Sequence, residues 1–241
     1  MLNWLHRLRS GSPRPAEPLA LQQWADDCGH GFRRVRDGQG CVIEDRQGKQ
    51  AWRAEWGASQ RSYIPGFELR LIADLDLPGE LMAMVINREL MAAMEKIVYE
   101  QFVDDVQTRI DTTTPSEMRW LVMCTKLTAA QLGRLLPRYG AVCSVVPWLV
   151  QWLSGPFNDA LAATIDQVGS AHPVVVTLAR GRLTLRTTMP QPDAASLALW
   201  FSVFEHALRD AGRLGFEWRQ AAGGGLTTQP AAWSTSELVR T

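Results

Sequence analysis

The chain has 241 residues, of which 46% are apolar and 21% charged, a composition typical of a globular protein rather than a disordered one. Lys plus Arg and Asp plus Glu number 25 each, so the chain has no net positive charge that would attract nucleic acid or an anionic membrane. We therefore expect no nucleic-acid partner. Most of the basic residues are arginines, which the codon usage of a GC-rich bacterial genome explains as well as a need for anion contacts does.

Cysteine usage and hydropathy predict a cytoplasmic protein. The four cysteines, Cys28, Cys41, Cys124 and Cys143, lack the close spacing of a disulfide framework, and a chain with this apolar fraction does not need disulfides to fold. The first ten residues lack the long apolar run and the small-residue cleavage site of a secretory signal, and no stretch of the sequence reaches transmembrane length.

Residues 1–18 are predicted to be a flexible segment and linker ahead of the folded part. Residues 1–8 have the pattern of a short amphipathic helix, and residues 10–18 are rich in Gly, Ser and Pro. Two interpretations stay open: a terminus that docks loosely, or an anchor that makes weak peripheral contact with a membrane or partner through residues 1–9. An isolated helix of eight residues is unstable, which favours the first interpretation.

The first predicted unit, residues 19–110, holds an antiparallel meander that ends in a long helix. Asp37-Gly38-Gln39-Gly40 joins two short strand-like runs and is a strong hairpin signal. Apolar and polar residues alternate through residues 67–76, and from Pro78 the apolar positions recur at helical spacing. The expected elements are a helix over 19–28, strands over 32–36, 41–45, 52–56 and 67–76, and a helix over 78–103.

The second predicted unit, residues 116–220, follows a break over residues 111–115. Residues 118–125 are apolar on both faces and predict a central strand. Asp193 is well placed as the N-cap of the helix that follows a second hairpin. Residues 221–241 are predicted to be a flexible tail. The expected elements are a strand over 118–125, helices over 128–139 and 147–165, strands over 174–178 and 183–187, a helix over 193–212 and a strand over 216–219.

These elements predict an α+β fold in which long helices pack on one face of an antiparallel sheet. The order hairpin, proline, helix occurs twice, once in each unit, although the residues of the two copies differ. Internal duplication and independent convergence on the same packing both explain this repeat. The sequence also leaves open whether the two units share one sheet or form two domains.

No motif in the sequence predicts catalysis, a metal or a cofactor. Cys28, His30 and Cys41 are ligand types near the first hairpin, but they lack the paired spacing of a structural zinc site. The chain has no nucleophile elbow, no P-loop and no complete dinucleotide-binding fingerprint. We therefore expect no catalytic residue, no metal and no cofactor; whether the protein is an enzyme stays open, with a non-enzymatic role favoured.

Several arginines fall on the polar faces of the predicted strands or in the loop between two of them. They are Arg53, Arg61, Arg70, Arg182 and Arg186. Guanidinium groups suit bidentate contacts with phosphate or carboxylate, so a pocket in which these side chains converge would bind anions. Glu55 and Glu68 occupy the same faces, and cross-strand ion pairs on a solvated surface explain the pattern without any ligand.

Two groups of apolar residues are predicted to stay exposed after the core is packed. Met82 and Ile86 lie on the flank of the predicted helix away from its buried face, and Trp148 and Trp152 lie one turn apart. A contiguous exposed apolar patch usually marks an interface. The leading hypothesis is therefore a non-enzymatic adaptor or chaperone-like assembly protein that binds another protein or a second copy of itself through apolar helix surface. The alternative is a small anionic-ligand binder, or an enzyme, that uses the arginines.

Overall fold

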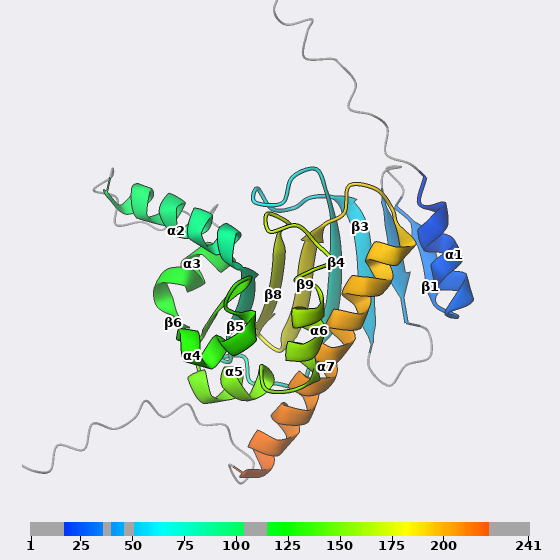
Figure 1. Cartoon of the computed structure of the whole chain (residues 1–241). Coiled ribbons are helices and arrows are strands. Elements are labelled where there is room, and N and C mark those ends of the chain that lie inside the picture. Colours follow the sequence, from blue (N-terminus) through cyan, green and yellow to red (C-terminus); the bar gives the residue numbers. More distant parts are fainter. Residues whose placement is uncertain (1–16, 36–39, 46–50, 104–114, 222–241) are drawn as a thin grey trace, which may run out of the picture.

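The computed structural model describes residues 17–35, 40–45, 51–103 and 115–221, and these residues build one antiparallel sheet with helices on both faces (Figure 1). The α+β class predicted from the sequence is confirmed. The strands lie in the order β1 (Gly31–Arg34), β2 (Cys41–Glu44), β3 (Trp52–Ala58), β4 (Phe67–Asp74), β9 (Arg182–Thr188), β8 (Val174–Ala179), β5 (Ala83–Asn87), β7 (Tyr139–Cys143) and β6 (Thr125–Lys126). The helices are α1 (Leu19–Asp27), α2 (Arg88–Val103), α3 (Ser116–Met123), α4 (Ala129–Leu132), α5 (Val146–Trp152), α6 (Pro156–Ala163) and α7 (Ala194–Ala221).

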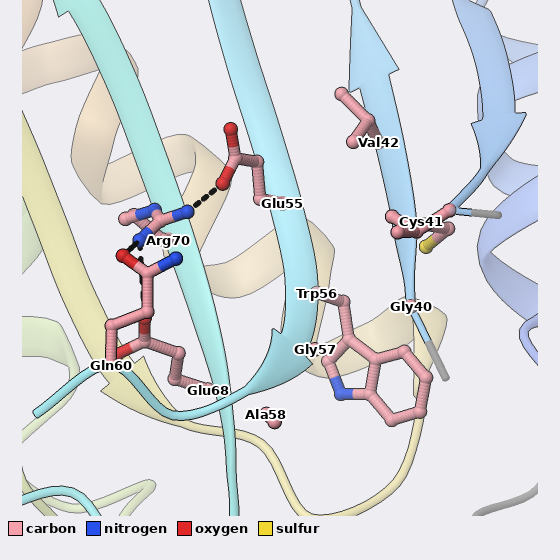
Figure 2. A pocket seen from close by; sticks show the side chains of 11 residues that line it. Gly40, Cys41, Val42, Glu55, Trp56, Gly57, Ala58, Gln60, Glu68 and Arg70 are labelled. Atoms are coloured by element: carbon pink, nitrogen blue, oxygen red, sulfur yellow. Dashed lines mark hydrogen bonds and ion pairs between the residues drawn. The ribbon is translucent and has the colours of Figure 1, made fainter. Parts of the chain in front are cut away.

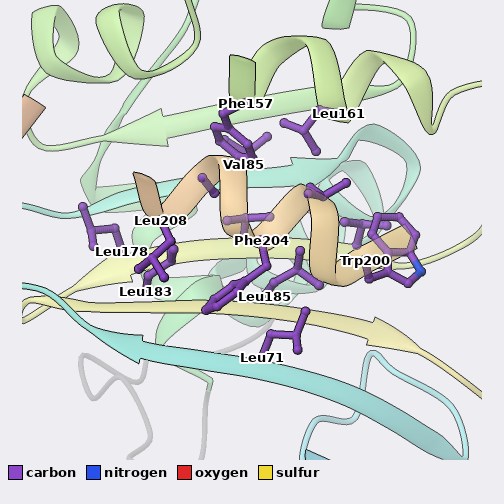
Figure 3. Close-up of a cluster of buried hydrophobic side chains, with 14 of the residues drawn as sticks. Leu71, Val85, Phe157, Leu161, Leu178, Leu183, Leu185, Trp200, Phe204 and Leu208 are labelled. Carbon is purple, nitrogen blue, oxygen red and sulfur yellow. The ribbon is translucent and has the colours of Figure 1, made fainter. Parts of the chain in front are cut away.

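Helix α7 runs across the first face of the sheet and builds much of the core there (Figure 3). Trp200, Phe204 and Leu208 follow one another at intervals of four residues, so they lie along one side of the helix. They are buried in one cluster with alternate residues of the strands, such as Leu71 in β4 and Leu185 in β9. Helices α1, α5 and α6 also contact α7 and extend this layer.

The second face of the sheet is divided into an apolar half and a charged half. Over β5, β7 and β8 the face carries apolar residues such as Ile86 and Val175, which pack with Met94 of α2 and Met118 of α3 in a separate buried cluster. Across β3, β4 and β9 the same face carries charged residues instead. Helices α2 and α3 contact β5 and β7, which places them over the apolar half (Figure 1).

Two of the elements that differ from the sequence prediction do so because an apolar run fits more than one structure. Residues 118–125 were expected as a strand, but α3 spans Ser116–Met123 and buries Met118 and Leu121, three residues apart on one helical side. The strand expected over 216–219 is instead the continuation of α7 to Ala221. Gly215 lies within this helix at a place where a Cβ atom would collide with Leu77, so the glycine allows the β4–β5 connection to approach α7 closely.

The helix expected from Pro78 begins only at Arg88, because β5 precedes it. All five residues of β5 are buried, and the strand lies between β8 and β7 with an antiparallel pairing on each side. Asn87 then accepts a hydrogen bond from the backbone N–H of Leu90 at 2.9 Å and so caps the first turn of α2. In the second predicted unit the proline-rich segment leads directly into α7, so the two hairpin-and-helix units differ in topology at this point.

The two predicted units contribute to the same sheet. Strand β4 of the first unit pairs with β9 of the second over seven residue pairs, and β5 is inserted between β8 and β7 of the second. The boundary expected at residues 111–115, the segment over 1–18 and the tail over 221–241 fall almost wholly outside the described residues. Within the described residues, no helix combines the length and hydropathy needed to cross a membrane.

Candidate functional site

The charged half of the second face is centred on one row of cross-strand neighbours. In this row Val42 of β2 lies opposite Glu55 of β3, Glu55 opposite Arg70 of β4, Arg70 opposite Arg186 of β9, and Arg186 opposite Val175 of β8. Neighbours in such a row point to the same face of a sheet. The antiparallel register therefore brings together side chains that are far apart in the sequence.

Five residues form a chain of ion pairs with alternating charge across β3, β4 and β9. Arg53 Nε lies 2.6 Å from Glu55 Oε1, and Arg70 Nη2 donates to the other oxygen of the same carboxylate. Arg186 Nη1 donates to Glu68 Oε1 at 2.8 Å, and Arg70 Nη1 lies 3.5 Å from that same oxygen. Three guanidinium groups and two carboxylates therefore leave one positive charge, and a guanidinium stands at each end of the chain.

The centre of this ion-pair chain is shielded from water. Glu68 is 2% exposed and Arg186 is 9% exposed, whereas the side chain of Arg53 at the outer end is 46% exposed. Burial, together with the positive charges of Arg186 and Arg53, lowers the pKa of Arg70 to about 10. The cationic side chains therefore repel one another in spite of the carboxylates between them.

A partly buried ion pair joins this region to α3. Arg61, in the connection between β3 and β4, donates from Nε to Glu117 Oε1 at 3.0 Å. Glu117 lies in the first turn of α3, and its side chain is only 4% exposed. Tyr63 lies close by: burial raises its pKa well above the usual range, the Glu117 carboxylate adds to this, and the positive charge of Arg186 opposes it. Tyr63 thus lies within electrostatic reach of both Arg186 and the Arg61–Glu117 pair.

An open pocket of about 280 Å³ lies beside Arg70 (Figure 2). Glu55, Gln60 and Glu68 surround the Arg70 guanidinium on one side of the pocket, and Val42 of β2 stands opposite. Arg70 Nη1 also donates to the side-chain oxygen of Gln60. The pocket therefore has a charged wall from β3 and β4 and an apolar wall from β2.

The structure brings together four of the five predicted arginines. Arg53, Arg70 and Arg186 belong to the ion-pair chain. Arg61 pairs with Glu117 instead and lies near the chain, since its charge and that of Arg186 both lower the pKa of Tyr63. Arg182 lies apart, at the other end of β9, where it pairs with the exposed Asp74 at 2.7 Å.

The partners of these arginines were only partly visible in the sequence. Glu55 and Glu68 fall on the predicted polar faces, but the strand register that aligns them with arginines is a tertiary property. Glu117 and Tyr63 were missed because one lies at the start of a helix read as a strand and the other lies in a loop.

The apolar residues predicted to be exposed are mostly core residues. Trp148, Trp152 and Ile86 are each 0% exposed, so the expectation that they form a surface patch is wrong; Met82 is half-buried. Helix α5 packs against α7, where Trp152 Nε1 donates to the backbone carbonyl of Ala207 at 3.0 Å. Ile86 is in a strand rather than a helix and packs beneath α2 and α3.

Large exposed apolar side chains occur in pairs on α2 and α3, and singly on α1 at Leu19 and on α7 at Phe216. Ile97 and Tyr99 of α2 are 44% and 69% exposed, and Val122 and Met123 of α3 are 59% and 70% exposed. The apolar helix surface of this protein therefore lies on different residues from those predicted.

The cysteines and histidine near the first hairpin do not form a metal site in the described part of the chain. Cys41 is buried, and burial raises the pKa of its thiol to about 12. The His30 ring packs edge-on to Trp52 and near Trp24, with centroid distances of 4.8 and 5.6 Å. Among the described residues, no group of three or more His, Cys, Asp or Glu side chains is arranged to hold a metal ion.

Comparison with known proteins does not assign the chain to a family. No family model and no curated protein matches the chain. Among solved structures, the chain has a remote likeness to the mycobacterial trehalose monomycolate transport factor A, with 7% sequence identity and a TM-score of 0.44 over 82% of this chain and 93% of that one. A likeness at this level carries no argument about fold or function.

Proposed function

We propose that the protein is a non-enzymatic binding protein that holds an anionic group, a carboxylate or a phosphate, against the arginines of β3, β4 and β9. The observation that carries the proposal is the ion-pair chain, in which three guanidinium groups outnumber two carboxylates on the charged half of the sheet. An anion bound here gains charge-assisted hydrogen bonds and also relieves the repulsion between Arg70 and its two cationic neighbours.

Arg186 is the arginine best placed to contact such an anion. A guanidinium carries five N–H donors, and the described residues accept one hydrogen bond from Arg186, that of Nη1 to Glu68. Arg70, by contrast, uses both of its terminal nitrogens on Gln60 and Glu55. Burial strengthens a hydrogen bond between Arg186 and an anion because the local dielectric constant is low.

The test is thermal unfolding of the full chain with inorganic phosphate or succinate, against sodium chloride at the same ionic strength. A ligand at 100 times its dissociation constant stabilises a protein by about 2.7 kcal/mol. For a chain of this size that corresponds to a rise in Tm of roughly 5–10 °C. No shift with either anion, in the wild-type protein, refutes the proposal.

Two substitutions on the same strand locate the site. Arg186→Gln removes the charge but keeps a donor for Glu68, and we expect it to abolish the anion-dependent shift. Arg182→Gln is the matched control, since Arg182 lies on β9 but pairs with Asp74 away from the pocket; it should keep the full shift. Equal shifts in both variants place the anion elsewhere.

A second candidate function is that of an adaptor, and the exposed apolar residues of α2 and α3 favour it. Tyr99 and Met123 are each about 70% exposed, the highest exposure of any large apolar side chain among the described residues. If this surface binds a second copy, light scattering should show self-association; if it binds a different protein, that protein should co-purify with the chain. In either case Tyr99→Ser together with Met123→Ser should abolish the association. A cytoplasmic location is part of both proposals: all four cysteines are free thiols, as expected in a reducing compartment.

A further inference from the structure

The pocket beside Arg70 has an acidic side as well as a basic one. Two carboxylates, those of Glu55 and Glu68, line it together with a single guanidinium, that of Arg70. The surplus positive charge of the ion-pair chain lies outside the pocket, at Arg53 and Arg186. The pocket itself therefore suits a hydrogen-bond donor or a cation, while an anion is favoured at its neighbour Arg186.

Two polar atoms in this charged wall have no hydrogen-bond partner among the described residues. They are Oε2 of Glu68 and Nε of Arg70, and both are buried. Glu68 is 98% removed from solvent, and buried carboxylate oxygens nearly always accept a hydrogen bond. An unpartnered acceptor and an unpartnered donor thus lie on adjacent side chains of one pocket (Figure 2).

We infer, on the basis of the proposed function, that the ligand is a small zwitterion, an amino acid with a short aliphatic side chain. Its ammonium group is held by Glu68 and Glu55 inside the pocket, and its carboxylate faces Arg186 and the free Nε of Arg70. Its side chain lies against Val42 of β2 and against Val35, which follows β1 and also lines the pocket.

The size of the pocket agrees with a ligand of this kind. About 280 Å³ is just under the roughly 300–1,000 Å³ typical of pockets for drug-sized ligands. Glycine at position 57 leaves the β3 side of the pocket without a side chain, directly across from Glu68 in the strand pairing. The pocket thus has room for a small molecule beside the charged wall.

The test compares three probes that differ by one charged group each, measured by calorimetry on the full chain. They are L-valine, isovalerate, which lacks the ammonium group, and isobutylamine, which lacks the carboxylate. We expect L-valine to bind at least 10-fold more tightly than either of the others. Equal affinity for L-valine and isovalerate overturns the inference but leaves the anion-binding proposal intact. Binding of isobutylamine as tight as that of L-valine also overturns the inference, because the carboxylate then contributes nothing; the anion-binding proposal is decided separately by the shift with phosphate or succinate.

Two variants tie the preference to this pocket. Glu68→Gln should remove the preference of L-valine over isovalerate while isovalerate still binds, because the amide cannot neutralise an ammonium group. Val35→Trp alters the half-exposed apolar wall and touches no member of the ion-pair chain, so it serves if Glu68→Gln does not fold; it should weaken L-valine at least 10-fold. Wild-type affinity for L-valine in either folded variant overturns the inference.

Discussion

Glu68 is the carboxylate that joins Arg70 of β4 to Arg186 of β9, and Glu68→Gln tests how much this link stabilises the fold. Its Oε1 atom accepts from Arg186 at 2.8 Å and lies 3.5 Å from Arg70, and all three side chains are about nine-tenths buried or more. Removing one member of a buried ion pair typically costs about 3–5 kcal/mol, because the remaining charge is left uncompensated. Gln still accepts a hydrogen bond, so we expect the low end, about 3 kcal/mol. That loss lowers Tm by roughly 6–12 °C for a chain of this size.

The same two strands provide a matched control for this prediction. Asp74 of β4 pairs with Arg182 of β9 at 2.7 Å, but these side chains are 73% and 59% exposed. Exposed ion pairs contribute about 0.2–1 kcal/mol, so Asp74→Asn should change the free energy of unfolding by no more than that. Guanidinium chloride denaturation of both variants measures the difference. If Glu68→Gln loses no more stability than Asp74→Asn, the buried chain does not stabilise the β4–β9 pairing and the reasoning is refuted.

Three further outcomes are expected. Trp152→Ala should cost about 3–5 kcal/mol in the free energy of unfolding, because the side chain is fully buried; a loss under about 1 kcal/mol in chemical denaturation would return Trp152 to the surface. Asp193→Ala should cost about 1 kcal/mol in the free energy of unfolding at pH 7, because it removes the N-cap of α7. Hydrogen bonds from Ser196 lower the pKa of the Asp193 carboxylate, so this group stabilises the fold above its unfolded pKa of 3.8. The difference in Tm between variant and wild type should therefore shrink as the pH falls below that value. At pH 8 a thiol reagent should modify the exposed Cys28 first, and Cys41, whose pKa burial raises to about 12, only after unfolding; the order of labelling read by mass spectrometry checks this.

Local patterns located most strands and helices correctly. The hairpin of β1 and β2, strands β3 and β4, and the hairpin of β8 and β9 follow from alternating residues and turn signals within a few positions of the observed bounds. The helix expected over 128–139 begins as expected, where Thr128 and Gln131 form a capping box, but α4 ends at Leu132 and Tyr139 begins β7. These features depend on residues close together in the chain, which is why the sequence reveals them.

Predictions failed where a segment is apolar without a clear period. Strand β5 was read as part of a helix because its five residues are buried on both faces of the sheet and show no alternation. Helix α3 was predicted as a strand because its exposed side also carries apolar residues, Val122 and Met123, which hide the helical period of the buried side. Which structure such a run adopts depends on the elements that pack against it.

The sequence by itself determined the α+β class, the presence of arginines on polar strand faces and the carboxylates that share those faces. It did not determine that Arg70 lies beside Arg186, because the β4–β9 pairing joins residues more than 100 positions apart. Burial was also decided by the tertiary structure alone: Trp148 and Trp152 are core residues only because α7 lies against α5. A sequence pattern records which side of an element is apolar, whereas the partner that covers that side, and the charges brought next to one another, depend on packing between distant segments.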